Sequence, residues 1–587
     1  MLYFIHMKKT VLAATLMAIF AATASSINLN GSWEFKFEEG KSARQCADAG
    51  FKSTDTIPVP GCYDAMPKWY LKRGTGLYRR SFTLEKAVDR AWLVVDGMGL
   101  AAEFMIDGKP IGSSSLAYSK LKFATGPLAA GEHTIFAALD NRLDFDTFKL
   151  GRPYYDFYLY GGFYHGVSLV FDDRELRVRT RSFATSTIEI EAVGFGSGDF
   201  TADAVFDSKN TVKAEFRNSR ATLTVPECRL WSPESPSLHT VCINGVKARF
   251  GVRTFEARGR HLYLNGKRIF LKGANRHEAH PTFGAATPES LMLADIQRLK
   301  ELGGNFIRGA HYQQAQRFLD LCDENGILVW EESLGWGNGQ AYTDTRQEEL
   351  ADRRFVAEQI EQTKLMVEAS FNHPSVVIFA FMNEFNSASK AGKELADRLI
   401  AAIKGYDSGR LVSFACNLNG SDISNESTDI VSFNAYPGWI GSNPGSSDNL
   451  KRLFRQEFAR IVGYHRRKWG DKPIIISENG TCGEYGRHDD AAAQWTEEFE
   501  AEYLSSSIEA AFANPDITGY AIWQLTDCRS FHRDGSNIRV KPFAENLAGV
   551  YDGYRRPKTA VVRTVKEAFA AAAAAMAGER PPEPEST

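Results

Sequence analysis

The chain has 587 residues, of which 43% are hydrophobic and 24% are charged, and its formal net charge at pH 7 is −3. This length leaves room for several cored domains, and the composition is not that of a disordered chain. With so little net charge and no long basic block, neither a nucleic-acid partner nor a polybasic membrane surface is indicated. Carbohydrate partners fit better, because 12% of the residues are aromatic and rings pack on the apolar faces of sugars.

The N-terminus has the pattern of a targeting segment. Residues 10–24 (TVLAATLMAIFAATA) form a short apolar stretch behind a pair of lysines, and Ala22-Thr23-Ala24 has the small-x-small form of a cleavage site. We therefore predict a signal peptide over residues 1–24, cleaved near Ala24, and an exported protein, periplasmic or secreted. A buried helix or an uncleaved membrane anchor is the alternative, but the stretch falls short of the ~20 residues that a bilayer requires. No membrane insertion is expected.

Two β-domains are predicted before residue 257. From 27 to 173, short alternating segments such as SWEFKF and AWLVVDGM are separated by Gly, Pro and Asp, with no long helical pattern between them. This pattern is typical of a β-sandwich. Residues 174–256 repeat it on a smaller scale in TIEIEAVGF, KAEFRN and HTVCING, which predicts a second all-β domain.

From 257 to 575, apolar strands alternate with amphipathic helices. The predicted strands are RIFLKGA (268–274), NFIRGA (305–310), ILVWEE (327–332), VVIFAFMN (376–383), LVSFAC (411–416), IVSFNAY (430–436), PIIISE (473–478) and GYAIWQL (519–525). Eight such strands predict a (β/α)8 TIM barrel. An open doubly wound sheet is the alternative, but the Gly-rich phosphate loop that usually follows its first strand is absent. Residues 576–587, rich in Pro and Glu, are predicted to be a disordered tail.

Two glutamates follow predicted barrel strands. Glu384, preceded by Asn383, comes at the end of the fourth strand, and Glu478 comes at the end of the seventh. The carboxyl ends of barrel strands meet at one mouth, where such barrels keep their chemistry. A lone strand-end glutamate is more often a salt-bridge partner, but two carboxylates facing one cleft are the acid/base and the nucleophile of a glycosidase. The pair therefore predicts glycoside hydrolysis.

Several longer stretches match one known family. They are LWSPESPSLH, GVRTFEARGRHLYLNGKRIFLKGANRHEAHP, NFIRGAHY, FLDLCDENGILVWEE, FNHPSVVIFAFMNE, FNAYPGW, KPIIISENG, GYAIWQLTD and GVYDGYRRPKTA. Together they resemble glycoside hydrolase family 2, the group of β-galactosidases, β-glucuronidases and β-mannosidases, over nearly the whole mature chain. The resemblance implies a jelly-roll sandwich over 27–173, an immunoglobulin-like sandwich over 174–256 and a catalytic barrel over 257–575.

The resemblance also implies roles for strand-end residues. Glu384 looks like the general acid/base, and Glu478 looks like the nucleophile. Asn383 resembles the neighbour that binds the 2-hydroxyl of the sugar, a contact that strengthens as the oxocarbenium ion develops. Arg308 resembles the residue that orients the nucleophile, and Tyr436 resembles the tyrosine that hydrogen-bonds to it.

Further sugar contacts are implied at other positions. His277 and His311 look like hydroxyl ligands, although a single histidine is more often an ordinary satisfied one. Trp523 matches the aromatic floor under the sugar, although a lone tryptophan is usually core. Asp156, in YDFYLYGGFYHGV of the first sandwich, resembles an aspartate that reaches into the mouth, and a surface turn is the alternative. Asn434, in FNAYPGW, is also an implied substrate-binding residue.

The residues around Asn546, another implied substrate-binding residue, bear on the choice of sugar. Glucuronidases of the family carry Asn-x-Lys here, and the lysine pairs with the carboxylate of the sugar. This chain has Ala548 in place of the lysine, so a uronate would arrive without that partner. Arg539 or Lys541 could supply the charge instead, and FNAYPGW and GVYDGYRRPK look more like the glucuronidase branch. Both substrates therefore stay open.

No metal or other cofactor is predicted, because acid/base chemistry by two carboxylates needs none. The Glu-x-His magnesium site that large galactosidases place in the barrel mouth is expected to be absent. The eight cysteines show no Cys-x-x-Cys spacing, which argues against a zinc ribbon or a redox pair and leaves any disulfide pairing open.

Two further positions complete the sequence-based picture. Glu484 is a rival nucleophile, but it follows Thr-Cys-Gly in a loop, where a strand would not fix it. Phe379 replaces the tryptophan usual in the acid/base segment, a change expected to alter the shape of the pocket.

The expected function is that of an exported retaining exo-β-glycosidase that removes terminal non-reducing β-D-galactosyl residues by double displacement. A β-glucuronidase is the alternative within the family. A non-catalytic carbohydrate-binding protein is the alternative from another class, but it would not need both carboxylates with their supporting Arg, Asn and Tyr. Linkage, aglycone and assembly into a homo-oligomer are left open.

Overall fold

The computed structural model describes residues 26–47, 51–144, 146–150, 157–340, 347–439, 447–530 and 541–577. The predicted signal peptide and residues 578–587 of the predicted tail lie outside these ranges, as do Asp156 and Arg539. Export and cleavage near Ala24 therefore stay predictions. None of the described helices combines the length and the apolar character that crossing a bilayer demands.

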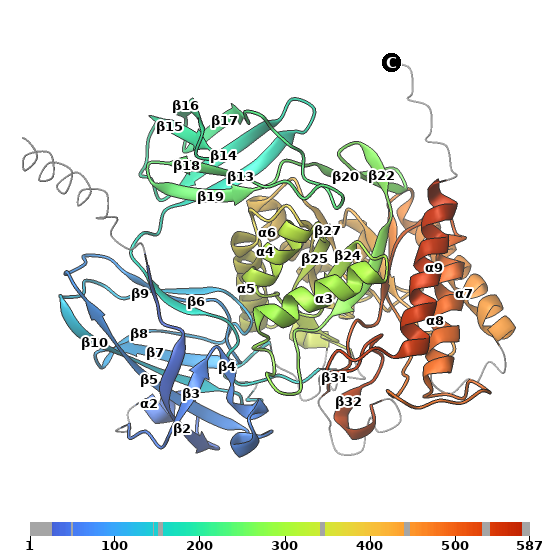
Figure 1. Ribbon diagram of the computed structural model, residues 1–587, viewed down its shortest axis with the longest axis horizontal. Coiled ribbons are helices and arrows are strands. Elements are labelled where there is room, and N and C mark those ends of the chain that lie inside the picture. Colours follow the sequence, from blue (N-terminus) through green and yellow to red (C-terminus); the bar gives the residue numbers. More distant parts are fainter. Residues whose placement is uncertain are drawn as a thin grey trace, which may run out of the picture.

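The N-terminal part is a sandwich of two antiparallel sheets, blue in Figure 1. The alternating residues of its strands bury one face, so that Trp33 and Phe35 meet Tyr78 edge-on between the sheets. One sheet has the strand order β1 (Ser26–Asn28), β12 (Val167–Val170), β6 (Trp92–Val95) and β9 (Leu121–Ala124). The other sheet has the order β3 (Asp55–Val59), β2 (Gly31–Glu39), β5 (Gly74–Leu84), β10 (Gly131–Asp140), β7 (Ala101–Ile106) and β8 (Lys109–Ser114). Shorter elements are α2 (Ala43–Ala47), β4 (Gly61–Cys62), η1 (Tyr63–Ala65), η2 (Pro67–Trp69) and β11 (Gly162–Phe163).

A second, smaller sandwich follows and lies at the top of Figure 1. Its sheets are β13 (Glu175–Ser182), β14 (Thr187–Val193), β17 (Arg220–Thr224), and β16 (Asn210–Phe216), β15 (Phe200–Phe206), β18 (His239–Ile243), β19 (Val246–Phe250). Strict alternation of buried and exposed residues, as in β17, fills a separate core that includes Ile188, Ile190, Phe206 and Phe250.

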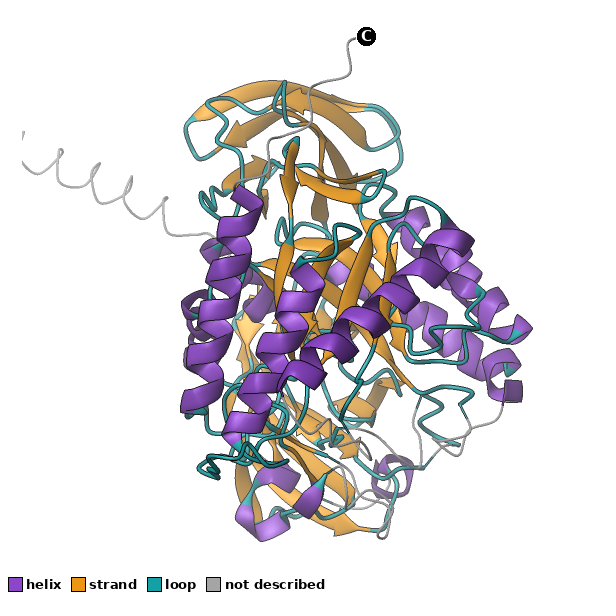
Figure 2. Cartoon of the chain, turned by 90° about the vertical axis from the view of Figure 1, so that its right-hand side faces the viewer, coloured by secondary structure: helices purple, strands orange, loops and turns teal. Residues whose placement is uncertain are grey.

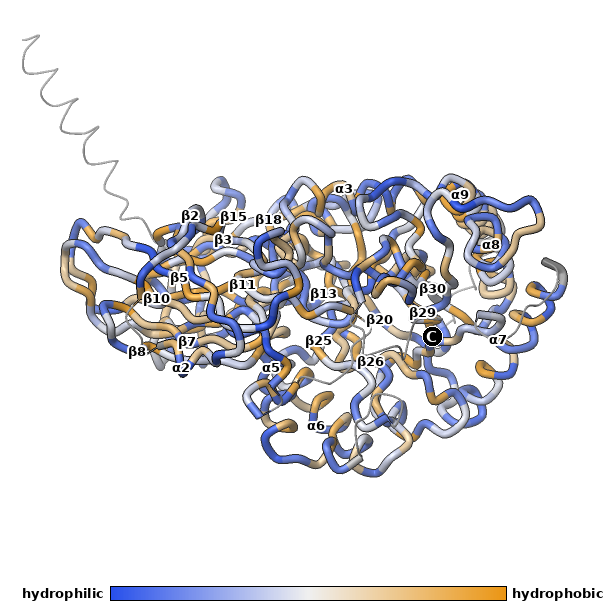
Figure 3. Tube along the Cα trace, turned by 90° about the horizontal axis from the view of Figure 1, so that it is seen from below, coloured by the Kyte–Doolittle hydropathy of each residue, from blue (hydrophilic) through white to orange (hydrophobic). Residues whose placement is uncertain are grey.

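The remainder is a parallel eight-stranded barrel surrounded by helices (Figure 2). Its strands, in chain order, are β23 (Leu271–Arg276), β24 (Phe306–Gly309), β25 (Leu328–Trp336), β26 (Val376–Asn383), β27 (Leu411–Ser413), β28 (Val431–Asn434), β29 (Ile474–Asn479) and β30 (Ile517–Ile522). Buried faces on both sides explain their continuous apolar runs, and the middle of the barrel is mostly hydrophobic while outer loops are hydrophilic (Figure 3). The predicted fold class is confirmed.

Helices separate successive strands, except that only a short 3₁₀ turn lies between β27 and β28. They are α3 (Glu289–Glu301), α4 (Gln316–Asn325), α5 (Arg353–Ala369), α6 (Lys390–Tyr406), α7 (Ser447–Trp469), α8 (Glu497–Phe512) and α9 (Thr559–Ala577), with short 3₁₀ turns η4 (Gln347–Ala351), η5 (Ser424–Glu426) and η6 (Pro542–Ala544). Asp352, Ser389 and Thr496 cap α5, α6 and α8 by accepting a bond from a backbone N–H of the first turn. Helix α9 continues to Ala577, two residues into the predicted tail.

The first predicted barrel strand is divided in the structure. Residues from 255 form an antiparallel unit of β20 (Phe255–Arg258), β21 (His261–Leu264) and β22 (Lys267–Ile269), and the barrel strand starts only at Leu271. Asn265 and Gly266 both have positive φ, which closes a tight hairpin between β21 and β22. Leu262 and Leu264 of this unit pack with Leu271 and Trp330 at the base of the barrel.

The barrel closes between β27 and β28 without a continuous ladder. Two buried serines take over part of the bonding there, because Ser413 Oγ donates to the Ile430 carbonyl at 2.9 Å and Ser432 Oγ to that of Phe414 at 2.5 Å. The Asn434 N–H also donates to the Cys416 carbonyl at 2.7 Å. None of the eight cysteines, all of which lie in the described ranges, forms a disulfide.

The first sandwich docks against the barrel through buried polar and aromatic contacts. His165 Nε2 lies 2.8 Å from Glu278 Oε2, and both side chains are buried. Tyr118 stacks on Tyr312 with ring centroids 3.8 Å apart. Gln313 Nε2 donates to Ser119 Oγ at 3.1 Å. The sandwich is therefore fixed beside the ends of β23 and β24.

Replacing His165 with alanine should destabilise this joint by about 1–3 kcal/mol, because the buried Glu278 carboxylate would lose its closest partner and keep, among the described residues, only a hydrogen bond from Thr287 and Arg276 at 3.8 Å. Burial alone would lower the pKa of His165, but the charge and hydrogen bond of Glu278 outweigh it and the pKa is raised. The stabilisation is therefore complete below the unfolded pKa of about 6.5 and is lost as the pH rises through the folded pKa.

Thermal unfolding at several pH values checks this. His488→Ala, which removes a half-exposed histidine paired with Glu498, serves as the control and should change little. A His165→Ala variant as stable as the parent at low pH would contradict the prediction.

Candidate active site

Glu384 and Glu478 lie at the same end of the barrel. Asn434, on β28, connects their surroundings: its Nδ2 donates to Glu384 Oε1 at 2.8 Å, and its backbone pairs in register with Glu478. Its Oδ1 accepts from Ser477 Oγ at 2.7 Å. Glu384 has a φ of +50°, and its N–H donates to the Ala415 carbonyl at 2.9 Å, which fixes the turn that carries the carboxylate. The fold thus brings both predicted carboxylates to one mouth.

Both oxygens of Glu478 accept a short hydrogen bond. Arg308 Nη1 donates to Oε1 at 2.5 Å, and the Tyr436 hydroxyl donates to Oε2 at 2.6 Å. Burial, together with the charges of Glu478 and Glu384, raises the pKa of Tyr436 well above its usual value, so the phenol stays protonated as a donor. A carboxylate held in this way is oriented by two donors, one on β24 and the other two residues after β28.

Arg308 is fully buried and has several other partners. Its Nε and Nη2 donate to Glu332 at 2.9 and 2.8 Å. Its Nη1 also donates to Asn275 Oδ1 at 2.9 Å, and its Nη2 to Asn383 Oδ1 at 3.0 Å. Burial would lower the pKa of Arg308, but Glu332 and Glu478 outweigh it and raise it, so the guanidinium stays charged. Glu332 and Asn275 are not among the residues predicted above, although Trp-Glu-Glu at the end of the third predicted strand was a signal.

Two histidines and a tryptophan form the inner surface of the mouth. His311 stacks on Trp523 with ring centroids 5.1 Å apart, and His277 meets Trp523 edge-on at 5.3 Å. Burial lowers the pKa of both histidines, that of His311 to about 3, so the rings are neutral near pH 7. A neutral imidazole offers one donor and one acceptor, which suits a hydroxyl group.

Four buried polar atoms of the predicted site have no hydrogen-bond partner among the described residues. They are His277 Nε2, His311 Nε2, Asn383 Nδ2 and Asn546 Nδ2. A buried polar atom left unpaired costs about 1–3 kcal/mol, and such atoms are rare in folded proteins. Because sugar hydroxyls both donate and accept, a bound pyranose could satisfy all four.

The first sandwich adds a wall to this mouth. The ring of Phe157 lies 5.0 Å from that of His277 and 5.7 Å from that of His311. Tyr158 fixes the segment by donating its N–H to the Arg529 carbonyl at 2.9 Å. Phe157 was not predicted, and Asp156 beside it lies outside the described residues. The site therefore lies between two domains.

The segment around Asn546 is held from below by a buried ion cluster. Lys558 Nζ donates to the Leu547 carbonyl at 2.7 Å and lies 3.1 Å from Asp527, whose Oδ1 accepts from the Gly549 N–H at 2.7 Å. Asn546 itself belongs to β32 (Glu545–Asn546), which pairs with β31 (Cys528–Arg529). The position of Asn546 is thus supported by β31 and by Lys558, the residue that precedes α9.

Apolar side chains surround Ala548, the position of the missing lysine. Ala548 packs with Ala310, Cys482 and Trp523 in an apolar cluster. Lys541 is buried in the loop between β31 and β32, and burial lowers its pKa to about 7. Arg539 lies outside the described residues.

Two sequence-based expectations need correction. Phe379 does not shape the pocket: its side chain packs in the outer core shared with the helices, 5.2 Å from the Arg410 guanidinium, because it faces the helix side of β26. A Glu-x-His sequence is also present, Glu278-Ala279-His280, but Glu278 pairs with His165 and His280 Nδ1 accepts from the Thr282 N–H. These two side chains therefore have other partners.

The rival nucleophile Glu484 is unlike Glu478. Its side chain is 52% exposed and lies 3.6 Å from Arg487 in a surface loop. Among the residues that the structure describes, no buried donor orients Glu484, which favours Glu478 as the nucleophile.

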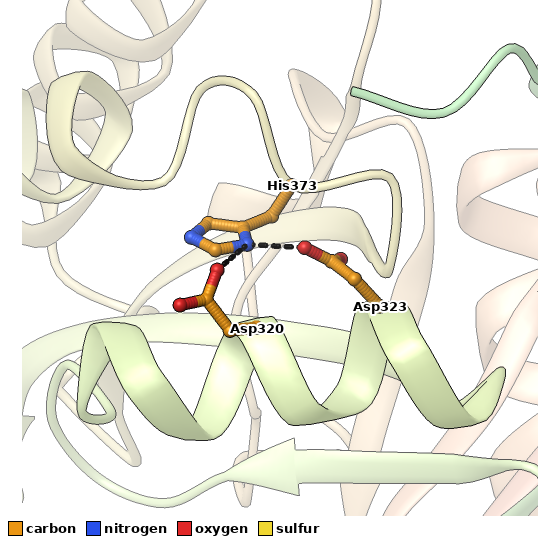
Figure 4. Close-up of side chains that lie close together, drawn as sticks. All are labelled: Asp320, Asp323 and His373. Atoms are coloured by element: carbon orange, nitrogen blue, oxygen red, sulfur yellow. Dashed lines mark hydrogen bonds and ion pairs between the residues drawn. The ribbon is translucent and has the colours of Figure 1, made fainter. Parts of the chain in front are cut away.

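One group of metal-ligand type occurs among the described residues, at the base of the barrel (Figure 4). His373 Nδ1 lies 2.6 Å from Asp323 Oδ2 and 4.0 Å from Asp320 Oδ1. Arg249 of the second sandwich hydrogen-bonds Asp320 and lies 3.5 Å from Asp323. Because a guanidinium already neutralises these carboxylates, the group is an ion-pair network joining two domains. His373 comes just before β26 in the chain, whereas Glu384 comes just after that strand, so the two lie at opposite ends of the barrel.

Comparisons with known proteins agree with this geometry. The family model "Glycosyl hydrolases family 2, TIM barrel domain" matches residues 255–572. A β-glucuronidase of Canis lupus familiaris is 27% identical over 438 residues, which are 70% of this chain and 64% of that protein, just under two thirds of its length. A β-glucuronidase of Streptococcus agalactiae serotype V is 23% identical over 93% of this chain and 96% of its own.

The solved structures give the same picture. A family 2 β-galacturonidase from Eisenbergiella tayi bound to galacturonate superposes with a TM-score of 0.79 and 29% identity, covering 93% of this chain and 97% of that one. The family model spans more than half of the chain, and its barrel carries the paired carboxylates. The chain therefore belongs to glycoside hydrolase family 2 and is a glycoside hydrolase.

Proposed function

We propose that the protein is a retaining exo-β-uronidase, which removes terminal β-D-hexuronosyl residues by a two-carboxylate double displacement. The mechanism rests on the different surroundings of the two carboxylates at one mouth. Glu478 accepts hydrogen bonds from Arg308 and Tyr436, whereas Glu384 accepts one from the neutral amide of Asn434. A non-catalytic binding protein would have no need of this arrangement.

In the first step, Glu478 attacks the anomeric carbon while Glu384 gives its proton to the departing glycosidic oxygen. This leaves a glycosyl ester on Glu478 and a carboxylate on Glu384. In the second step, Glu384 takes a proton from water, the water oxygen attacks the anomeric carbon, and the bond to Glu478 breaks. The sugar leaves with its original configuration, and both carboxyl groups return to their starting states. Asn383 Nδ2, unpaired in the described structure, is available for the 2-hydroxyl.

The comparisons favour a uronide over the galactoside expected from the sequence. The relatives reported above are named for uronides, and one structure holds galacturonate. A uronate needs a cation, and Lys541 is our candidate because it is buried and lies five residues before Asn546. Between the two epimers, the absence of the Asn-x-Lys lysine at Ala548 and the likeness to the galacturonidase favour the galacturonide.

Aryl β-galacturonide, β-glucuronide and β-galactoside should be compared by their kcat/KM values, and the galacturonide should be best. Lys541→Met should lower kcat/KM for the uronides by about tenfold or more and leave the galactoside unchanged. Because Lys541 is charged only below about pH 7, uronide kcat/KM should fall as the pH rises through 7.

Lys272→Met, which removes a half-buried lysine at the opposite end of β23, is the matched control. A protein that cleaves the galactoside and leaves both uronides untouched would overturn the proposed substrate.

Glu478→Ala should lower turnover by about 10⁴-fold or more, because no glycosyl ester can form. Azide should restore part of the rate and give a glycosyl azide of inverted configuration, since it attacks from the face that Glu478 occupied. Glu484→Ala should keep near-parental activity. The assignment is wrong if the two variants exchange these behaviours.

Glu384→Ala should slow substrates with poor leaving groups by about 10²–10⁴-fold, because only these need protonation to depart. Activated aryl glycosides should still form the ester, and azide should then give a product of retained configuration because it needs no general base. Equal losses on both substrate classes, or an inverted azide product, would rule out this role.

A further inference from the structure

A second pocket, far from the mouth, lies between the second sandwich and the base of the barrel. It has a volume of about 200 Å³ and is lined by β13, the residues that follow β19, and the loops that precede β26 and β27. Pro374, in its wall, comes just before β26, whereas Glu384 follows that strand. The pocket therefore opens at the end of the barrel opposite to the carboxylates.

The lining of this pocket is rich in arginine. Four guanidinium groups line it, against two carboxylates; the arginines are Arg179, Arg181, Arg253 and Arg410, and the acids are Glu256 and Asp407. Both acids already have partners: Arg410 hydrogen-bonds Asp407, Arg179 lies 3.6 Å from Asp407, and Arg258 pairs with Glu256. Arg181 also pairs with Glu189, which is not part of the lining. With Arg258 and Glu189 counted, five guanidinium groups face three carboxylates, an excess of two positive charges.

Arg253 is the least compensated of these groups. Its Nε donates to the Pro374 carbonyl at 2.9 Å and its Nη2 to that of Val376 at 2.6 Å, but Nη1 has no hydrogen bond and no carboxylate within 4 Å among the described residues. Burial and the nearby Arg410 lower the pKa of Arg253 to about 9. The two backbone carbonyls thus use only Nε and Nη2 of this guanidinium and leave Nη1 available.

Two neighbouring donors are also unsatisfied. Thr254 Oγ1 and Arg179 Nε are buried in the pocket wall without a hydrogen-bond partner in the described structure, although Arg179 Nε lies 3.6 Å from Asp407 Oδ1. The donors come from the second sandwich and the segment that follows it, while Arg410 comes from the barrel. A ligand here would contact both domains.

We propose that this pocket binds a small tetrahedral oxoanion, such as phosphate or sulfate, and so ties the second sandwich to the base of the barrel. Guanidinium forks match the oxygen spacing of oxoanions and bind them through paired hydrogen bonds. An oxoanion would supply the missing negative charge and accept from Arg253, Arg179 and Thr254. This site is independent of the glycosidase chemistry.

Thermal unfolding of the whole protein at matched ionic strength tests the proposal, with chloride as reference and inorganic phosphate and sulfate as probes. Ligands that bind only the folded state raise the midpoint with the logarithm of their concentration, and we expect a rise of about 2 °C or more. Arg253→Met should abolish the rise. Arg181→Gln and Thr254→Val, which change less of the structure, should reduce it if Arg253→Met does not fold.

Arg217→Gln is the matched control, because that arginine lies on the second sandwich outside the pocket with its side chain 79% exposed. It should keep the full rise. The proposal is overturned if phosphate and sulfate do no more than chloride, or if the pocket variants show the same rise as the control. Neither outcome depends on glycosidase activity.

Discussion

The active end of the barrel depends on one buried guanidinium. Arg308 joins five strands, because its partners are Asn275 on β23, Glu332 on β25, Asn383 on β26 and Glu478 on β29, while it lies itself on β24. Taking such a charge out of water costs several kcal/mol, and only a full set of acceptors offsets it. The position of Glu478 is therefore tied to the closure of the whole barrel. Because Arg308 is shared with Glu332, its charge is not devoted to Glu478 alone.

Several side chains at this end of the barrel have a hydrogen-bond partner for one polar atom and none for another. Asn383 accepts from Arg308 through Oδ1, while its Nδ2 has no partner in the described structure, and the Nε2 atoms of His277 and His311 are likewise unpaired. Strand-anchored groups of this kind need little reorganisation when a sugar arrives, which is the basis of electrostatic preorganisation. Phe157, supplied by the first sandwich, keeps the histidines in apolar surroundings and so in their neutral form.

Much of this could be predicted from the sequence, for identifiable reasons. Glu384 and Glu478 follow apolar runs that alternate with amphipathic helices, and this alternation strongly indicates barrel strands. Glu332 was missed although it ends the third predicted strand, because its role depends on a contact with Arg308 of a neighbouring strand, which the pattern of apolar runs does not reveal. Phe379 was misplaced because a strand buried on both faces gives no clue to which side a residue faces. The division of the first predicted barrel strand after Ile269 and the wall formed by Phe157 could not be predicted, because both depend on contacts between segments far apart in the chain. The choice between galactoside and uronide rested on the single position Ala548, which could not decide it.

The link between Lys558 and the Leu547 carbonyl has a consequence for biosynthesis. A ribosome delivers the chain from its N-terminus, so both sandwiches and both glutamates emerge before α9 does. Until Lys558 arrives, Asp527 and Glu500 lack their buried cation and the Leu547 carbonyl lacks its lysine donor. We therefore expect the surroundings of Asn546 to reach their final form only after Lys558 has been synthesised, later than the barrel strands that carry both glutamates.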